Sequence, residues 1–69
     1  DVSFCIGYIS KNKIGISARS IGNYDVEKIM KNLGGGGHLT EAATQIKNIN
    51  IESAINLLIN EIDNQGEVI

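Results

Sequence analysis

Gly34-Gly35-Gly36-Gly37-His38 interrupts the pattern of apolar and polar residues near the middle of the chain. Four consecutive glycines leave a backbone without side chains, so another group can approach its N–H donors closely. The segments on both sides are predicted to be helical, which makes the run a bend inside a folded domain. Because N–H groups at the start of a helix carry a partial positive charge and favour anions, the run predicts a phosphate-binding turn.

The residues before the glycines predict a β-hairpin. Residues 2–9 and 14–20 are rich in β-branched and aromatic types, and the polar residues 10–13 between them are typical of a turn. Side chains alternate between the two faces of a strand, so residues 14–20 have one apolar face for the core. The opposite face carries small residues until it reaches Arg19, and we expect something else to lie against it.

A helix is expected between the hairpin and the glycines. Asp25 is suited to cap its N-terminus, and Gly34 is expected to close it in the left-handed conformation. An apolar stripe with the spacing i, i+3, i+4, i+7 is formed by Val26, Ile29, Met30 and Leu33.

After the glycines, residues 39–43 predict one or two helical turns, and residues 44–48 a short strand. Asn50 is suited to cap a last helix that runs to about Gln65. The expected order is therefore β-β-α-(glycine loop)-α-β-α. The expected fold class is α/β (α+β), with a small mixed sheet, a β-hairpin, packed helices and a glycine-rich loop between helices. Residues 1–69 are expected to form a single domain.

Length and charge narrow the function classes. A chain of 69 residues buries only about 60% of the surface that its unfolded form exposes, so we expect part of a larger protein or a domain that completes its core against a partner. A net charge of −2 argues against broad, salt-driven binding to long nucleic acid. No apolar run approaches the roughly 20 residues of a membrane span, so no direct membrane contact is expected. The single Cys5 fits a reducing, cytoplasmic location.

Two side chains are candidates for phosphate contacts. His38, the single histidine, can donate a hydrogen bond to a phosphate oxygen, and the Arg19 guanidinium suits a bidentate phosphate contact. The alternatives are a structural histidine, a solvated surface arginine, and glycines that serve only a tight backbone crossing. No carboxylates or histidines group as a metal or catalytic site, so the chain alone is not expected to be an enzyme.

Residues 16–20 are Ile-Ser-Ala-Arg-Ser, and residues 34–43 are Gly-Gly-Gly-Gly-His-Leu-Thr-Glu-Ala-Ala. Together they resemble the DHH-associated (type one) domain of DHH phosphoesterases, over about residues 6–62. Thr40, Thr44 and Gln45 make the GdpP-type cyclic-di-AMP phosphodiesterases the most similar branch. A looser Gly-Gly-His-x-x-Ala-Ala core is shared by nanoRNases and single-strand exonucleases of the superfamily.

The resemblance implies a division of labour within one protein. A catalytic domain with an Asp-His-His motif and two manganese ions, absent from these residues, would hydrolyse cyclic-di-AMP to linear di-adenylate. The associated domain would close over the substrate and hold its phosphate and distal nucleotide. The implied contacts, with the two serines as secondary candidates, come from Gly35, Gly36, Gly37, His38, Arg19, Ser17 and Ser20.

Other expectations follow from the same resemblance. These residues correspond to the C-terminal part of the associated domain, are inactive alone, and belong to a parent that is membrane-anchored elsewhere. The alternatives are a nanoRNase that acts on short oligoribonucleotides and a structural or dimerising module that binds no ligand. Exposed isoleucine-rich edges also favour a homodimer.

Overall fold

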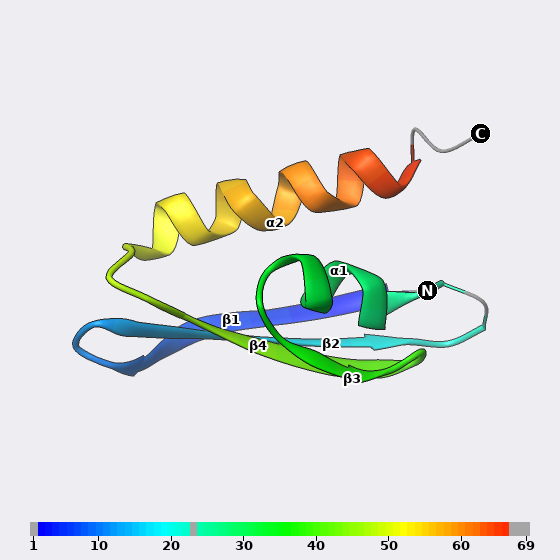
Figure 1. Ribbon diagram of the computed structural model, residues 1–69, viewed down its shortest axis with the longest axis horizontal. Helices are drawn as coiled ribbons and strands as arrows, with labels where there is room; N and C mark the ends of the chain where they lie inside the picture. The colour runs from blue at the N-terminus through cyan, green and yellow to red at the C-terminus, as the bar shows by residue number, and fades with distance from the viewer. Residues whose placement is uncertain (1, 23, 67–69) are drawn as a thin grey trace.

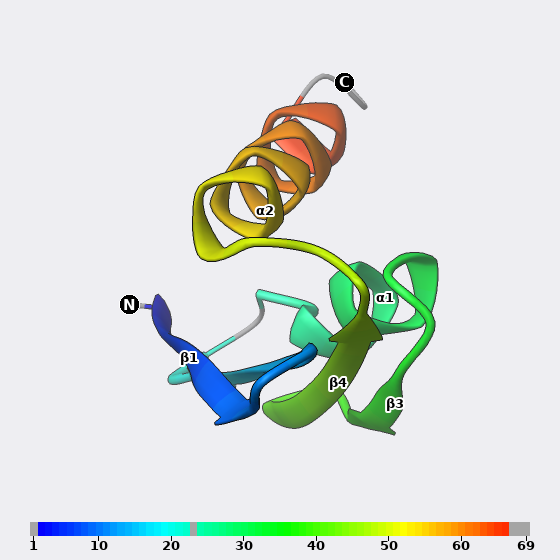
Figure 2. The same ribbon diagram turned by 90° about the vertical axis from the view of Figure 1, so that its left-hand side faces the viewer.

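An antiparallel sheet and two helices form two layers, with both helices on the same face of the sheet (Figure 1). The computed structural model describes residues 2–22 and 24–66. The elements follow in the order β1 (Val2–Ser10), β2 (Lys13–Ser20), α1 (Val26–Asn32), β3 (Gly36–His38), β4 (Glu41–Lys47) and α2 (Ile51–Gly66). The strand order is β1-β2-β4-β3, and Figure 2 shows α1 and α2 above it. The predicted α+β class and N-terminal hairpin are confirmed.

The core lies between the sheet and the helices. Ile14, Ile16 and Ala18 of β2 are buried on this face, as the alternation predicts. The hydrophobic side chains buried with them come from both helices and β4: Val26, Ile29, Met30, Ala42, Ala54 and Leu58. Each large apolar side chain that is fully buried contributes about 1.5–3 kcal/mol, so this single layer is the main source of stability.

Both predicted helix caps are present. The Asp25 carboxylate accepts a hydrogen bond from the Lys28 N–H at 3.0 Å, at the start of α1. At the start of α2, the Asn50 side-chain oxygen accepts from the Ser53 N–H at 2.8 Å. Gly34 follows α1 with φ of +92°, the left-handed conformation expected of the residue that closes a helix.

The helix predicted over residues 39–43 is wrong, because strands replace it. Only residues 33–35 separate α1 from β3, and β3 turns through residues 39–40 into β4. The predicted strand at 44–48 is the second half of β4, and the predicted mixed sheet is antiparallel at all its strand pairs in the described residues. Pairing with β2 outweighs the helix preference of Ala42 and Ala43, since it buries Ala42 and leaves Ala43 on the other face.

Two of the four glycines are required by close packing of β3 on β4. A Cβ added at Gly35 would collide with the Ala43 carbonyl oxygen. A Cβ added at Gly37 would lie 2.5 Å from the Ala42 Cα, and its φ of +144° is one that side chains disfavour. A Cβ at Gly36 would meet nothing within 4 Å. The fold therefore needs glycine at Gly35 and Gly37 but not at Gly36.

Hydrogen bonds connect the end of α1 to this strand pair. The Thr44 hydroxyl, buried in β4, donates to the Leu33 carbonyl at 2.9 Å, and the Gly35 N–H donates to the Met30 carbonyl at 2.7 Å. The last carbonyls of a helix lack the full set of helical partners, and these two donors bind at that end of α1. The position of β3 is therefore fixed by α1 on one side and β4 on the other.

We predict that Gly37→Ala lowers the free energy of unfolding by about 2–3 kcal/mol, because the new methyl group meets β4 in a disfavoured backbone conformation. Gly36→Ala is the matched control on the same strand and should change it by less than about 0.5 kcal/mol. Urea denaturation of both variants measures the difference. Equal midpoints would contradict the role assigned to Gly37.

Candidate functional site

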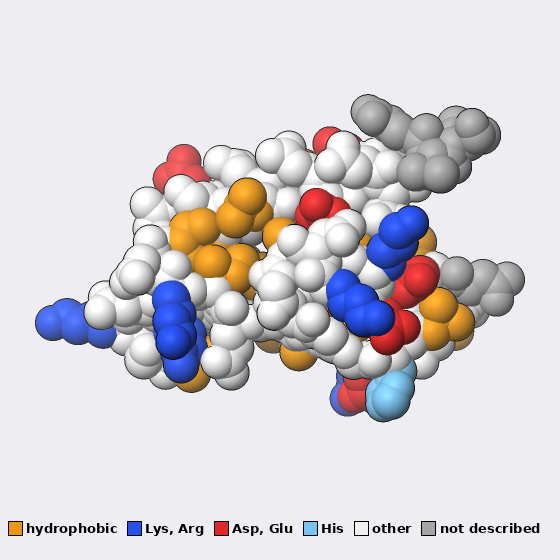
Figure 3. All heavy atoms as spheres, viewed as in Figure 1, with side chains coloured by type: hydrophobic (Ala, Val, Ile, Leu, Met, Phe, Trp, Pro, Cys, Tyr) orange, Lys and Arg blue, Asp and Glu red, His pale blue; other side chains and the backbone are white. Residues whose placement is uncertain are grey.

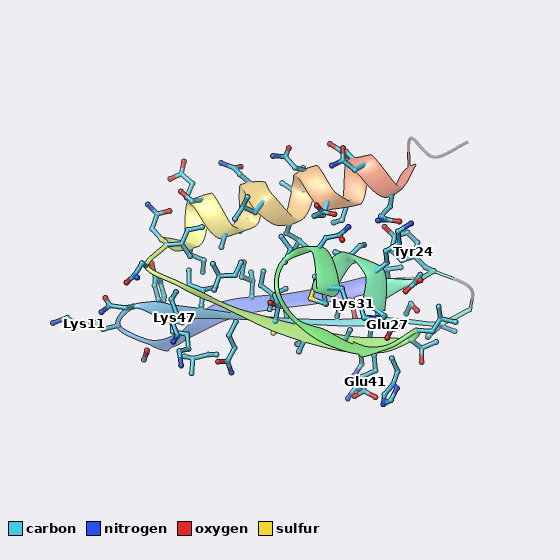
Figure 4. All side chains as sticks on the ribbon, in the orientation of Figure 1. Lys11, Tyr24, Glu27, Lys31, Glu41 and Lys47 are labelled. Carbon is cyan, nitrogen blue, oxygen red and sulfur yellow. The ribbon has the colours of Figure 1, made fainter. Side chains whose placement is uncertain are left out.

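The face of the sheet opposite the helices, here called the open face, carries a row of polar side chains. Arg19 of β2 pairs with Glu41 of β4, and Glu41 pairs with His38 of β3. Directly paired residues project to the same side of a sheet, so these three side chains form one row across three strands. Figure 4 shows Glu41 on the side of the sheet away from both helices. The register thus joins Arg19 and His38, which are 19 positions apart in the chain.

An exposed ion pair occupies the centre of this row. Arg19 Nη2 donates to Glu41 Oε1 at 3.1 Å, and the two side chains are 77% and 65% exposed. A guanidinium has five N–H donors, so this single contact leaves most of them available to a ligand. Ion pairs as exposed as this one contribute little to the free energy of unfolding. An incoming anion can therefore compete with the Glu41 carboxylate for Arg19. His38 is also exposed, and Figure 3 shows the histidine protruding beside acidic atoms.

The two candidate serines lie on opposite faces. Ser17 is exposed on the open face, where it pairs with Ala43, and Ala43 pairs with Gly36. Ser20 is only 8% exposed, and its hydroxyl donates to the Tyr24 carbonyl at 2.7 Å. Ser17 is therefore next to the polar row, whereas Ser20 holds the loop that leads into α1.

The glycine backbone differs from the anion site expected at a helix start. A strand, β3, directly follows Gly35, so the predicted helix start at the glycines is wrong. The Gly35 N–H is already bonded to the Met30 carbonyl. Gly36 and Gly37 instead belong to an edge strand, which is paired with β4 alone in the described part of the chain. An edge strand leaves part of its N–H and C=O groups without a strand partner. A ligand at Gly36 would meet this backbone from a side that has no side chain.

A shallow hollow of about 320 Å³ joins Arg19 and Ser17 to the glycine backbone. Its lining residues come from the three adjacent strands: Ser17, Ala18, Arg19, Gly36, Gly37, Glu41, Ala42 and Ala43. A guanidinium beside bare backbone and an exposed hydroxyl is an arrangement suited to an anionic oxygen group.

The family model described as "DHHA1 domain" matches residues 1–65 of the chain. The chain belongs to the DHHA1 domain family. This result confirms the resemblance found in the two sequence segments. It also assigns the sheet, both helices and the glycine strand of the structure to one family domain.

Relatives of this DHHA1 domain include two proteins named as cyclic-di-AMP phosphodiesterases. PdeA of Listeria monocytogenes is 52% identical over 61 residues, which are 88% of this chain and 9% of PdeA. GdpP of Bacillus subtilis is 42% identical over 67 residues, 97% of this chain and 10% of GdpP. A membrane protein–large ribosomal subunit bL9 fusion protein of Onion yellows phytoplasma is 47% identical over 58 residues, 84% of this chain and 7% of that protein. The DHHA1 domain thus spans about a tenth or less of these relatives.

Sequence reasoning missed Glu41 as a member of the site. Glu41 follows His38 by three positions. If residues 39–43 were helical, as predicted, nothing would place Glu41 beside Arg19. The strand reading places it between Arg19 and His38. Within residues 2–22 and 24–66, no group of three or more His, Cys, Asp or Glu could hold a metal ion. None of the helices described in this domain has the length and apolarity to cross a membrane.

We predict that Glu41→Gln strengthens binding of inorganic phosphate about two- to fivefold, because Arg19 loses a competing carboxylate. The free energy of unfolding should change by less than about 0.5 kcal/mol, since the ion pair is exposed. Glu27→Gln is the matched control, because it breaks the Lys31–Glu27 ion pair on α1 away from the open face. Amide NMR titration with inorganic phosphate measures the affinity of each variant. Weaker phosphate binding by Glu41→Gln would contradict competition between Glu41 and phosphate for Arg19.

Proposed function

We propose that this DHHA1 domain holds the phosphate of a nucleotide substrate for a phosphodiesterase whose DHH catalytic domain belongs to the same protein. The substrate we propose is cyclic-di-AMP, hydrolysed to linear di-adenylate. The observation that carries the proposal is the register that aligns Arg19, Glu41 and His38 beside the bare backbone at Gly36. The names of PdeA and GdpP support the choice of substrate.

The role of the domain is to bind and orient. Arg19 exchanges part of its contact with Glu41 for a phosphate oxygen, and His38 donates to the same group from β3. Ser17 adds a hydroxyl donor, and the absence of a side chain at Gly36 lets the phosphate come close to the strand. Holding a substrate in one orientation lowers the barrier of a reaction that other groups carry out. Manganese ions of the catalytic domain would supply the activation of water.

The setting of the domain is part of the proposal. We place it in the cytoplasm, in a parent protein anchored to the membrane by another segment, as the name of the phytoplasma relative suggests. Self-association is also proposed, because α2 leaves Ile55, Leu57 and Ile59 exposed by 37%, 40% and 48%. Figure 3 shows apolar side chains at the surface below α2.

A second candidate substrate is a short oligoribonucleotide. Lys13 and Lys47 are directly paired on the open face, although like charges at paired positions are unfavourable. They lie six residues along β2 from Arg19, roughly 20 Å at the rise of a strand. An extended nucleotide chain could place one phosphate at each end of this distance. Rates of hydrolysis of cyclic-di-AMP, linear di-adenylate and longer oligomers by the full-length protein separate the two substrates.

In the full-length protein, we predict that Arg19→Ala lowers kcat/KM for cyclic-di-AMP about ten- to a hundredfold, because a charge-assisted phosphate contact is lost. Lys28→Ala is the matched control, since it removes an exposed cation from α1 on the other side of the sheet. Steady-state kinetics of the two variants make the comparison. An Arg19→Ala enzyme with normal kinetics would leave Arg19 as a solvated surface residue.

We predict that Gly36→Val lowers kcat/KM as much as Arg19→Ala does, because the branched valine side chain would occupy the space through which the phosphate approaches the strand. Its fold should be retained, because a Cβ at Gly36 meets nothing within 4 Å and branched residues suit strands. Kinetics and thermal unfolding of the same preparation separate the two effects. Full activity in a folded Gly36→Val enzyme would exclude close backbone approach at this position.

A further inference from the structure

Three lysines lie together at the end of the sheet opposite the polar row. Lys13 of β2 pairs directly with Lys47 of β4, and Lys11 belongs to the turn between β1 and β2. Figure 4 shows Lys11 and Lys47 at the far end of the sheet from Glu41. The lysine cluster, defined as Lys11, Lys13 and Lys47, contains half of the six Lys and Arg residues of a chain whose net charge is −2. Positive charge is therefore concentrated at this end.

The backbone fixes the position of the cluster. The Asn48 N–H donates to the Asn12 carbonyl at 2.8 Å, so the end of β4 is attached to the hairpin turn. Lys13 is half-buried on β2, which has a paired strand on each side. The sheet therefore holds Lys13 and Lys47 side by side, whether or not a partner is present.

No carboxylate among the described residues neutralises the cluster. The ion pairs in this part of the chain are Arg19–Glu41 and Lys31–Glu27, and neither includes a lysine of the cluster. Glu41 is the one carboxylate on the described strands, and it lies six residues along β4 from Lys47, roughly 20 Å away. Like charges at directly paired positions of a sheet are destabilising. A partner of opposite charge would remove this repulsion.

The cluster shares the open face with the proposed phosphate site. Lys13 and Arg19 are both odd-numbered positions of β2, so their side chains project to the same side of the sheet. A catalytic domain can reach a phosphate held by Arg19 only from that side. Because Lys13 and Arg19 are roughly 20 Å apart, one phosphate cannot contact both of them. The catalytic domain would therefore lie over the cluster as well as over the phosphate.

We propose that the lysine cluster is a docking surface for an acidic patch on the catalytic domain, and that this contact sets the orientation in which the two domains hold the substrate. The inference rests on the proposed function. Complementary charges on two surfaces speed their association and fix their register. Lysine suits this role, because its compact ammonium group on a flexible stem can meet carboxylates without one fixed geometry.

Lys47→Glu tests the docking surface by reversing one charge of the cluster. In the full-length protein, we expect kcat/KM for cyclic-di-AMP to fall about three- to tenfold, because the new carboxylate would face the acidic patch. The urea midpoint of the 69-residue chain should stay the same or rise, since the new carboxylate stands opposite Lys13. A merely structural role for Lys47 would lower the urea midpoint together with kcat/KM.

Lys28→Glu is the matched control, because it makes the same charge change at an exposed position of α1 on the other side of the sheet. It should leave kcat/KM close to that of the unmodified protein. Raising the salt concentration from about 0.05 M to about 0.5 M should bring the kcat/KM of Lys47→Glu closer to that of Lys28→Glu, because salt screens exposed charges. Amide NMR titration of the 69-residue chain should give the same affinity for inorganic phosphate with and without Lys47→Glu.

Carbodiimide cross-linking of the full-length protein identifies the partner, because it joins lysine amines to carboxylates that contact them. Mass spectrometry should find Lys13 or Lys47 linked to an Asp or Glu of the catalytic domain, and Lys28 without such a link. Links from the cluster only to a second copy or to a different segment of the protein would overturn the choice of the catalytic domain.

The outcomes separate this inference from the proposed function. If Arg19→Ala lowers kcat/KM while Lys47→Glu and Lys28→Glu have equal effects, the phosphate site stands and the docking surface is overturned. If Lys47→Glu slows hydrolysis of longer oligomers alone, the lysines bind an oligonucleotide, and docking of the catalytic domain is overturned. If Arg19→Ala leaves the kinetics normal, the proposed function fails and this inference fails with it.

Discussion

The close contact between β3 and β4 is the constraint on which the open face depends. Gly35 and Gly37 have no side chains, so the short edge strand reaches β4 and pairs with it. This pairing brings His38 opposite Glu41, and the pairing of β4 with β2 brings Glu41 opposite Arg19. Packing thus requires two of the four glycines, at Gly35 and Gly37, and gives no reason for glycine at Gly36.

Stability and binding come from different faces of the sheet. The side chains that are fully buried, among them Ile14, Ile16 and Met30, all lie on the helix side. The side chains proposed to meet a ligand are exposed on the other side, where the ion pair adds little to the free energy of unfolding. The row of exposed polar groups on the open face therefore has little effect on the free energy of unfolding. The row is already formed in the structure without a ligand.

The sequence was sufficient for the elements with strong local signals. The hairpin, the caps at Asp25 and Asn50, and the left-handed Gly34 follow from alternation, side-chain hydrogen bonding and backbone freedom. The second half of the sheet was misread because Ala42 and Ala43 favour a helix locally. Their pairing with β2 involves residues more than twenty positions away, and no local pattern reports such a contact.

The candidate site on the open face also depends on contacts between residues that are distant in the sequence. Arg19, His38 and Ser17 could be selected by type and by resemblance, but their alignment depends on register, which places Glu41 between two of them. The burial of Ser20 is different, because alternation alone puts it on the face opposite Arg19. That signal was present in the sequence and identifies Ser20 as part of the loop structure.

Alternation along β2 and β4 has an evolutionary consequence. Odd-numbered positions from Lys13 to Arg19 face the open side, and even-numbered positions from Ile14 to Ser20 face the core. Substitutions in one set leave the packing of the other largely intact, since the two sets share few contacts. Side chains on the open face can therefore change among descendants of one ancestral domain while the conditions for folding stay the same. A single eight-residue strand contains both the positions that stability constrains and the positions that stability leaves free to change.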